Sequence, residues 1–311
     1  MYLESFIRHK ATQLGFATVG FASAGPNRSY DRFQEWLARG YAGDMAWLSQ
    51  NRALRAHPSL LAPYVKTIIV AAARYPTARP SGHWSNYALG RDYHDVLRAK
   101  LKELAEAIRG QISVPLRARV CVDSAPILER EWACRAGLGW IGRQGSLVHP
   151  EFGCCLFLGE LLTDLELEAS PAVPNQCGDC RLCVKACPAG AIQSDGFVDA
   201  RRCLSYLTIE HKGEIPAALR PLVGTKLFGC DRCTAVCPWN PLAAPGTDGI
   251  MPQFTAANPP LPTPEACLAM TEADFKRRFT GTAVHRLGLQ RLQRNAAVAL
   301  TNKKLFEERP R

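Results

Sequence analysis

The sequence predicts an α+β protein, in which a mixed α/β domain is followed by a small cysteine-rich domain and a short helical segment. Helical and strand patterns alternate over the first 165 residues. Eight cysteines are then concentrated between residues 177 and 237, and a basic helical pattern runs from 272 to 304. With 311 residues and 47% hydrophobic content, the chain can bury a large core in two or three domains.

The N-terminal elements follow from hydrophobic periodicity. Helices are expected over residues 2–14, 31–39, 92–109 and 126–135. Strands are expected at "FATVGFA", "KTIIVAAA", "LRARVCV" and "CCLFLGELL", which are rich in β-branched and apolar residues. The proline-bearing stretch "ASPAVPNQ" ends this domain. The predicted domains are therefore 1–168, 169–245 and 246–311.

The cysteines are spaced as ligands of two iron-sulfur clusters. The segment "CGDCRLCVKACP" has the pattern C-x-x-C-x-x-C-x-x-x-C-P, and "CDRCTAVCP" repeats its closing part. In bacterial ferredoxin-like domains, the fourth cysteine of such a run binds the other cluster. This crossed pairing predicts one [4Fe-4S] cluster (cluster A) on Cys177, Cys180, Cys183 and Cys237 and a second (cluster B) on Cys187, Cys203, Cys230 and Cys233.

Zinc and disulfides are the alternatives for these cysteines. Zinc knuckles use separated C-x-x-C pairs around one ion, which three local cysteines and a fourth before proline fit poorly. Disulfide frameworks belong to small secreted domains that lack a core. For the remaining cysteines, the pattern favours structural thiols in apolar surroundings; they are Cys121, Cys134, Cys154, Cys155 and Cys267.

Charge and hydropathy restrict the partners. The formal net charge of +10 falls to about +6 once cluster thiolates and oxidised cluster cores are included. This excess favours a polyanionic partner, although a solvated basic surface fits equally well. No stretch is long and apolar enough for a membrane span, and "MYLESFIRHK" resembles an amphipathic helix more than a signal peptide. A reducing cytoplasm is the expected location.

A glycine-rich segment, "AGLGWIGRQG", lies between the predicted strand "LRARVCV" and the cysteine-rich domain. Gly137, Gly139 and Gly142 match the dinucleotide pattern G-x-G-x-x-G, but that pattern must follow a strand and open a helix. Here a helical period precedes it. We interpret the segment as a loop that lets backbone approach a flat ligand, with a tight turn as the alternative.

Asp123 follows an apolar strand, and Ser124 stands at the expected start of a helix. An aspartate at this place is commonly a helix cap. It could also be a general acid, which would need a raised pKa beside a bound substrate. Position alone does not separate the two roles.

Five segments together resemble the epoxyqueuosine reductases, a cobalamin-dependent family that completes queuosine synthesis in tRNA. They are "VDSAPILEREWACRAGLGWIGRQG", "FLGELLTDLELE", "CGDCRLCVKACPAGAI", "DARRCLSYLTIEHKGEIP" and "FGCDRCTAVCPWN". The resemblance runs from the first helix to about Pro241 with the segments in family order.

The resemblance implies a nitroreductase-like catalytic domain that holds a base-off corrinoid against the ferredoxin-like domain. A histidine ligand to cobalt is not supported, because the D-x-H-x-x-G signature has only the near miss Asp92, His94 and Leu97. His94 is expected on a helix surface or in the pocket. By similarity Asp123 is the proton donor and a corrinoid contact, and the other corrinoid-lining residues are Asn86, Arg130, Gln144, Ser205, Asp231 and Arg232.

The implied reaction reduces epoxyqueuosine to queuosine at the tRNA wobble position, using cob(I)alamin fed by two [4Fe-4S] clusters. Asp123 would protonate the oxygen of the opening epoxide. The resemblance further implies a tRNA anticodon stem-loop as partner, a low-potential electron donor such as flavodoxin or ferredoxin, and a monomer.

The C-terminal part departs from longer family members, which continue into a helical-repeat domain. "RLQRNAAVALTN" resembles the entry to such a repeat, and any tRNA contact from that domain is expected to be absent. Residues 276–294 carry six Lys or Arg and no acid, which suits phosphate contacts or a solvated helix face.

Two other functions fit parts of the pattern. A corrinoid and iron-sulfur reductive dehalogenase would share both cofactors, but such enzymes carry an N-terminal twin-arginine signal, whereas Arg201 and Arg202 lie in mid-chain. An electron-transfer iron-sulfur protein without corrinoid is the second.

Overall fold

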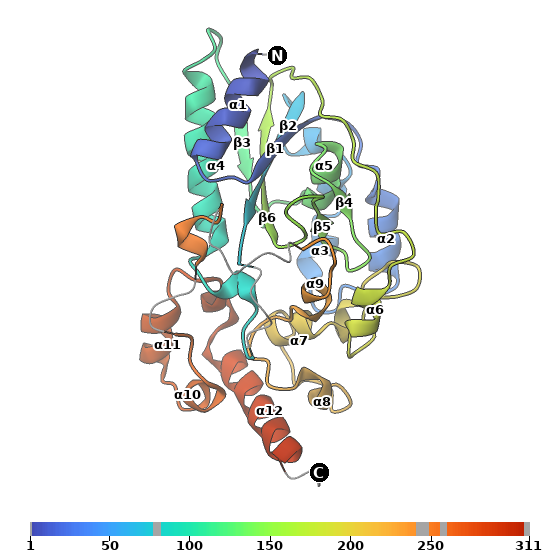
Figure 1. Ribbon diagram of the computed structural model, residues 1–311, viewed down its shortest axis with the longest axis vertical. Coiled ribbons are helices and arrows are strands. Elements are labelled where there is room, and N and C mark those ends of the chain that lie inside the picture. The colour runs from blue at the N-terminus through green and yellow to red at the C-terminus, as the bar shows by residue number, and fades with distance from the viewer. Residues whose placement is uncertain (1, 77–81, 241–248, 256–259, 308–311) are drawn as a thin grey trace.

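The structure is a computed structural model that describes residues 2–76, 82–240, 249–255 and 260–307 (Figure 1). The strands in the described residues are β1 (Thr18–Ser23), β2 (Thr67–Arg74), β3 (Ala118–Cys121), β4 (Trp140–Ile141), β5 (Leu147–Val148) and β6 (Leu156–Thr163). The helices up to residue 135 are α1 (Tyr2–Gln13), α2 (Tyr30–Ala38), α3 (Ala46–Gln50), α4 (Tyr93–Arg109) and α5 (Glu129–Arg135). The later helices are α6 (Leu182–Ala186), α7 (Leu204–Ile209), α8 (Arg220–Val223), α9 (Arg232–Ala235), α10 (Pro264–Leu268), α11 (Glu272–Phe279) and α12 (Leu289–Glu307).

Four strands form an antiparallel sheet in the order β1-β2-β6-β3. Successive side chains of β2 point to opposite faces of the sheet, and apolar side chains of β2 are buried on both faces. Ile69, Ala71 and Ala73 pack in one apolar core with side chains of α1 and α4, whereas Ile68 and Val70 pack in a second core that includes α5. Figure 1 shows α1 and α4 on one side of the sheet and α5 on the other. The predicted α+β class is confirmed.

Most predicted elements are present, but two differ in extent. The helix expected from residue 126 begins only at Glu129, with Leu128 as its N-cap. The long C-terminal helix expected over 272–304 is instead α11, a short 3₁₀ turn at Ala283–Leu287, and α12. Gly281 and Gly288 explain the breaks, because their φ angles of +78° and +77° lie outside the helical region.

The C-terminal helices are anchored to the cysteine-rich part of the chain. α12 packs against α7, α8 and α10. Its Asn295 is fully buried and donates from its amide to the carbonyl oxygens of Thr208 and Leu227, both at 2.8 Å. These bonds fix α12 beside the segment that carries Cys230. The domain boundary predicted at residue 245 lies outside the described residues.

Among the helices of the described residues, none has the length and hydropathy needed to cross a membrane.

Candidate active site

Asp123 lies two residues after the end of β3, in a left-handed backbone conformation with a φ of +50°. In the part of the chain that the structure describes, Asp123 is the only non-glycine residue with a positive φ. Backbone strain of this kind concentrates at functional sites. Its side chain is 56% exposed, so the carboxylate can reach a bound substrate. Tyr93 donates from its hydroxyl to Asp123 Oδ2 at 2.9 Å.

The first turn of α4 places His94 between two carboxylates. His94 is 6% exposed, and its Nε2 lies 2.9 Å from Asp123 Oδ2 while its Nδ1 lies 2.8 Å from Asp92 Oδ1. Asp92 also caps α4, because its Oδ1 accepts a bond from the His94 backbone N–H. Arg286 approaches from the C-terminal segment, with its guanidinium 3.1 Å from Asp92 Oδ2 and 2.7 Å from His94 Nδ1.

This arrangement favours a protonated His94 and an ionised Asp123. Burial lowers the pKa of His94, but its bonds to Asp123 and Asp92 outweigh burial, so the pKa is raised above its ordinary value. Burial likewise opposes ionisation of Asp123, yet the hydrogen bond and charge of His94 keep the pKa of Asp123 below its usual range. Of the two groups, His94 therefore keeps its proton to higher pH than Asp123.

Two further carboxyl groups lie behind the Asp123 loop. Glu129 accepts a bond from the Asp123 backbone N–H at 2.5 Å and so holds the strained residue in place. Burial and the charge of Asp123 raise the pKa of Glu129 to about 7. Glu160 on β6 is fully buried, and burial together with Glu129 raises its pKa well above the ordinary value. This shift favours the neutral form of Glu160, which avoids an unpaired buried charge.

The helix-cap interpretation of Asp123 is wrong. α5 begins at Glu129, six residues later, and residue 128 is its N-cap. Asp123 instead directs its carboxylate toward Tyr93 and His94. His94 is buried at the start of α4, which argues against the helix-surface alternative; its place in a corrinoid pocket stays a prediction.

The predicted cluster ligands fall into two neighbourhoods. In the cluster B set, burial raises the pKa of Cys203, Cys230 and Cys233, and the proximity of these thiols and of Cys187 adds to the effect. In the cluster A set, burial and then the nearby Cys177 and Cys180 raise the pKa of Cys183.

Cys237 is the fourth predicted ligand of cluster A. It packs with Cys177 in one apolar group that includes Trp140, Cys154 and Trp239. Within the described residues, no three His, Cys, Asp or Glu side chains meet closely enough to hold a single metal ion. A cubane differs, because its thiolates each bind a different iron and need not converge on one point.

The residues expected around a corrinoid come from three parts of the chain. Asp231 is buried and joins two of these parts, because its carboxylate accepts bonds from the Asn86 backbone N–H at 2.7 Å and from the Ser85 hydroxyl at 2.5 Å. Ser205 is half-buried on α7, whereas Arg130 on α5 and Arg232 on α9 are exposed. Gln144 is buried, and its Nε2 has no hydrogen-bond partner among the described residues.

The glycine segment forms a tight turn between β4 and β5. The Gly142 N–H donates to the Ser146 carbonyl and the Gly145 N–H to that of Gly142, both at 2.9 Å. A side chain at Gly139 would place its Cβ 2.0 Å from the Val148 carbonyl oxygen. The tight-turn alternative is therefore correct, and the flat-ligand interpretation is wrong at Gly139, where the protein's own backbone makes the close approach. As expected, the segment has no strand-to-helix dinucleotide geometry.

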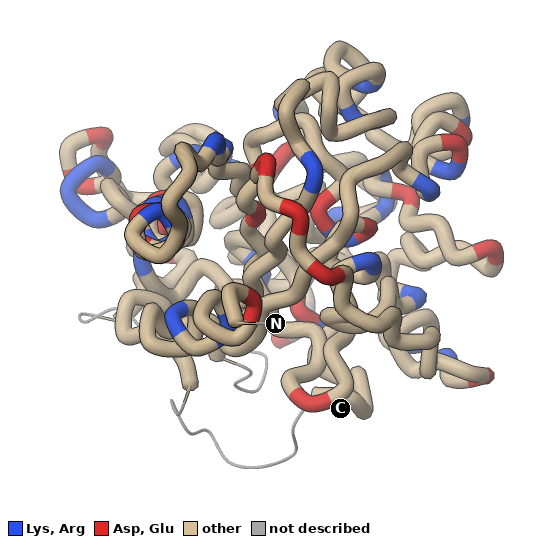
Figure 2. Tube along the Cα trace, turned by 90° about the horizontal axis from the view of Figure 1, so that it is seen from above, with Lys and Arg blue, Asp and Glu red and all other residues tan. Residues whose placement is uncertain are grey.

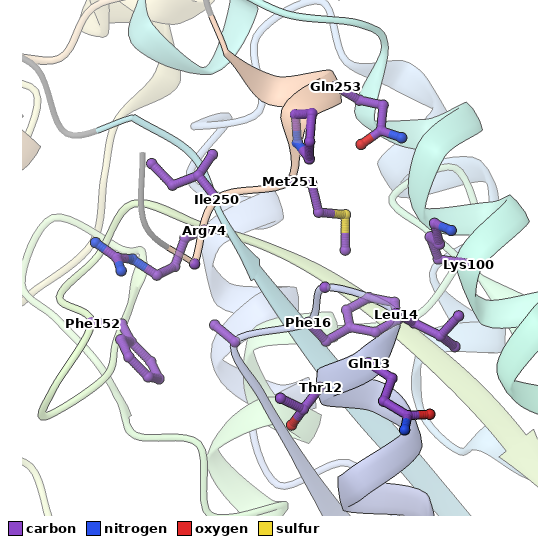
Figure 3. Close-up of a pocket in the computed structure, with 14 residues that line it drawn as sticks. Thr12, Gln13, Leu14, Phe16, Arg74, Lys100, Phe152, Ile250, Met251 and Gln253 are labelled. Atoms are coloured by element: carbon purple, nitrogen blue, oxygen red, sulfur yellow. The ribbon is translucent and has the colours of Figure 1, made fainter. Parts of the chain in front are cut away.

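A separate cavity of about 430 Å³ lies between the end of α1 and residues 249–253 (Figure 3). Arg74 and Lys100 contribute its cationic side chains, and Phe16, Phe152 and Met251 contribute apolar ones. It includes none of the predicted site residues.

Comparison with known proteins identifies the family. The family model "Epoxyqueuosine reductase QueG, DUF1730" matches residues 55–124, and the model "4Fe-4S double cluster binding domain" matches residues 176–240. The epoxyqueuosine reductase of Escherichia coli is 42% identical over 312 residues, which cover 96% of this chain and 81% of that protein. That of Pseudomonas aeruginosa is 38% identical, over 96% of this chain and 85% of the relative.

The chain belongs to the epoxyqueuosine reductase family.

Solved structures of epoxyqueuosine reductases have the same fold. One, crystallised with an epoxyqueuosine-modified tRNA-Tyr stem loop, superposes with a TM-score of 0.88 at 30% identity, covering 97% of this chain and 82% of that chain. The Bacillus subtilis enzyme, with its catalytic aspartate loop swung out of the active site, has a TM-score of 0.86 at 28% identity and covers 100% and 87%. Family membership favours the reductase over the dehalogenase and the simple electron-transfer protein.

The chain's residues fit both cofactors of this family. The double-cluster match spans all eight predicted cysteine ligands. The free amide donor of Gln144 is a buried polar atom of the kind that a bound ligand satisfies, and the periphery of a corrin ring carries amide carbonyls that accept such bonds. The residues near Asp231 and α7 would hold the corrinoid, and the cysteines would hold the clusters.

Part of the basic C-terminal segment is structural. The Arg294 guanidinium donates to the carbonyl oxygens of Leu207, His211 and Gly213, and Arg291 donates to that of Ile209. The expectation that this segment offers its cations to phosphate is therefore wrong for Arg294, whose donors are occupied. Figure 2 shows Lys and Arg spread over many elements with Asp and Glu among them.

We expect reconstituted protein to contain about eight irons per chain, as two cubanes require. Cys237→Ser should reduce the iron content toward four by disrupting cluster A, although Cys237 lies far in sequence from the other three ligands. Iron analysis and electron paramagnetic resonance (EPR) of the reduced protein measure this.

Cys134→Ser is the matched control, because Cys134 is a half-buried thiol outside both sets. Zinc in place of iron, or equal iron loss in both variants, would contradict the ligand assignment.

Proposed function

We propose that this chain reduces epoxyqueuosine to queuosine at the wobble position of tRNA, with Asp123 as the proton donor. The observation that carries the catalytic assignment is the solvent-facing Asp123 carboxylate 2.9 Å from Nε2 of His94, whose pKa is raised above its ordinary value. Family membership supports the substrate, since a related reductase was crystallised with an epoxyqueuosine-modified stem loop.

The overall change takes up two electrons and two protons, and it releases the epoxide oxygen as water. A bound corrinoid supplies a low-valent cobalt nucleophile for opening the ring, and the clusters supply electrons one at a time. The chain's own residues hold and transfer the proton that goes to the epoxide oxygen. His94 Nε2 holds it 2.9 Å from Asp123 Oδ2, from which the carboxyl can pass it to the epoxide oxygen.

Neighbouring groups prepare Asp123 for this transfer. Tyr93 and His94 orient its carboxyl from one side, and Glu129 fixes its backbone from the other. Displacement of water by the substrate would weaken the ionised form of Asp123 and favour transfer of the proton from His94. The low pKa of Asp123 in the open site is thus compatible with an acid role, because the proton is stored on its neighbour.

The electrons come from outside the chain. We infer a low-potential protein donor such as flavodoxin or ferredoxin, acting on a monomer in the cytoplasm. The exposed Leu182 and the solvent-facing loop around Cys180 support entry at cluster A. The position of Asp231 and Arg232 between Cys230 and Cys233 supports a place for cluster B next to the corrinoid.

Asp123→Asn should lower epoxyqueuosine turnover with a chemical reductant by roughly 10² to 10⁴, the usual loss for a general acid. The amide oxygen can still accept bonds from Tyr93 and His94, so iron content and cobalamin binding should remain near wild type. Nucleoside mass spectrometry of the treated tRNA measures the turnover. Ser124→Ala, at the neighbouring exposed position, is the control, and near-wild-type turnover by Asp123→Asn would move the acid to another group.

The single-turnover rate should fall as pH rises through the pKa of His94, which lies above its ordinary value of 6.5. The sign follows because the active form carries the proton on His94, and this form is complete only below that pKa. The charge of Arg286 opposes protonation of His94, whereas Asp92 and Asp123 favour it.

Arg286→Gln should therefore move the alkaline limb to higher pH, and His94→Gln should remove the limb and lower the rate. An unchanged limb in His94→Gln would show that His94 does not hold the transferred proton.

A further inference from the structure

Trp140 makes a hydrogen bond to a predicted cluster ligand. Its indole Nε1–H donates to the sulfur of Cys177, with an N···S distance of 3.3 Å. Trp140 is 3% exposed and belongs to the β4–β5 hairpin of the catalytic domain, whereas Cys177 begins the cluster A loop. The bond therefore crosses from one predicted domain to the other.

The surrounding contacts hold this bond in a dry and fixed setting. The Trp140 ring packs edge-on against Trp239, with ring centroids 4.9 Å apart, and both belong to the apolar group that contains Cys177 and Cys237. Arg143, from the same hairpin, donates to the carbonyl oxygens of Cys180 at 3.0 Å and Gly178 at 2.6 Å. The β4–β5 turn, whose glycine spacing resembles the dinucleotide pattern, is thus hydrogen-bonded to the cluster A loop.

A hydrogen bond to a cluster sulfur has a known electrostatic consequence. Reduction adds one negative charge to the cluster and its thiolates, and an N–H dipole aimed at a thiolate stabilises that added charge. Burial strengthens the effect because water does not screen the dipole. The bond therefore makes the reduction potential less negative.

We propose that Trp140 tunes the reduction potential of cluster A, making this cluster easier to reduce than it would be without the indole N–H. The cluster A loop faces solvent at Gly178, Asp179 and Leu182, which are exposed. A less negative potential suits a cluster that accepts electrons from outside the chain. The proposal concerns the cluster itself and is independent of the identity of the tRNA substrate.

Trp140→Phe is the test, because phenylalanine keeps an aromatic ring beside Trp239 and has no N–H donor, although its ring is smaller than the indole. We expect an EPR-monitored redox titration to show one midpoint moved to a more negative potential and the other unchanged. The matched control is Trp239→Phe, which alters the stacked ring but leaves the bond to Cys177. Its two midpoints should stay at the wild-type values.

Three results would overturn the proposal: unchanged midpoints in Trp140→Phe, an equal shift of both midpoints, or the same shift in Trp239→Phe. If Trp140→Phe fails to assemble eight irons, pulsed EPR of wild-type protein with ¹⁵N-labelled tryptophan indole decides the question. A ¹⁵N coupling to the reduced cluster supports the bond, and its absence contradicts it. Neither measurement depends on turnover, so a failed proposal here leaves the assigned reaction standing.

Discussion

The charge arrangement around His94 is the constraint on which the candidate site depends. A buried imidazole between Asp92 and Asp123 brings together the start of α4, the loop after β3 and, through Arg286, the C-terminal segment. Each carboxylate stabilises the imidazolium, and the imidazolium keeps both carboxylates ionised. Three segments far apart in sequence are thereby held around one proton, beside a carboxylate that faces solvent.

The same loop shows how a reactive group can be fixed without being buried. Asp123 has a strained backbone, and a strained residue persists only when its surroundings determine its position. Glu129 supplies part of that restraint by accepting a hydrogen bond from the backbone N–H of Asp123. The related Bacillus subtilis reductase was solved with its catalytic aspartate loop swung out of the active site.

Sequence patterns predicted much of the fold because they depend on local geometry. The alternation in "KTIIVAAA" predicted β2, and cysteine spacing grouped residues 60 positions apart. Asp92, His94 and Leu97 match a cobalt-binding signature incompletely. This mismatch argued only against His94 as a ligand of cobalt. That His94 meets Asp123 depends on how α4 packs beside β3, which no local pattern contains. Glu160 did leave a signal, since a charged residue inside the apolar run "CCLFLGELL" must face either a partner or a functional site. The glycine spacing correctly indicated that another group approaches the backbone closely. It did not indicate that this group is the carbonyl of Val148.

The protonation state of His94 tests the account most directly. Nitrogen NMR of protein labelled at the histidine ring nitrogens, with His94→Gln to assign the signal, reports whether each ring nitrogen carries a proton. We expect the pKa of His94 to lie above its ordinary value of 6.5 and to fall in Asp123→Asn, which removes one of the two flanking charges. A pKa at or below 6.5 that Asp123→Asn leaves unchanged would contradict the charge arrangement around His94.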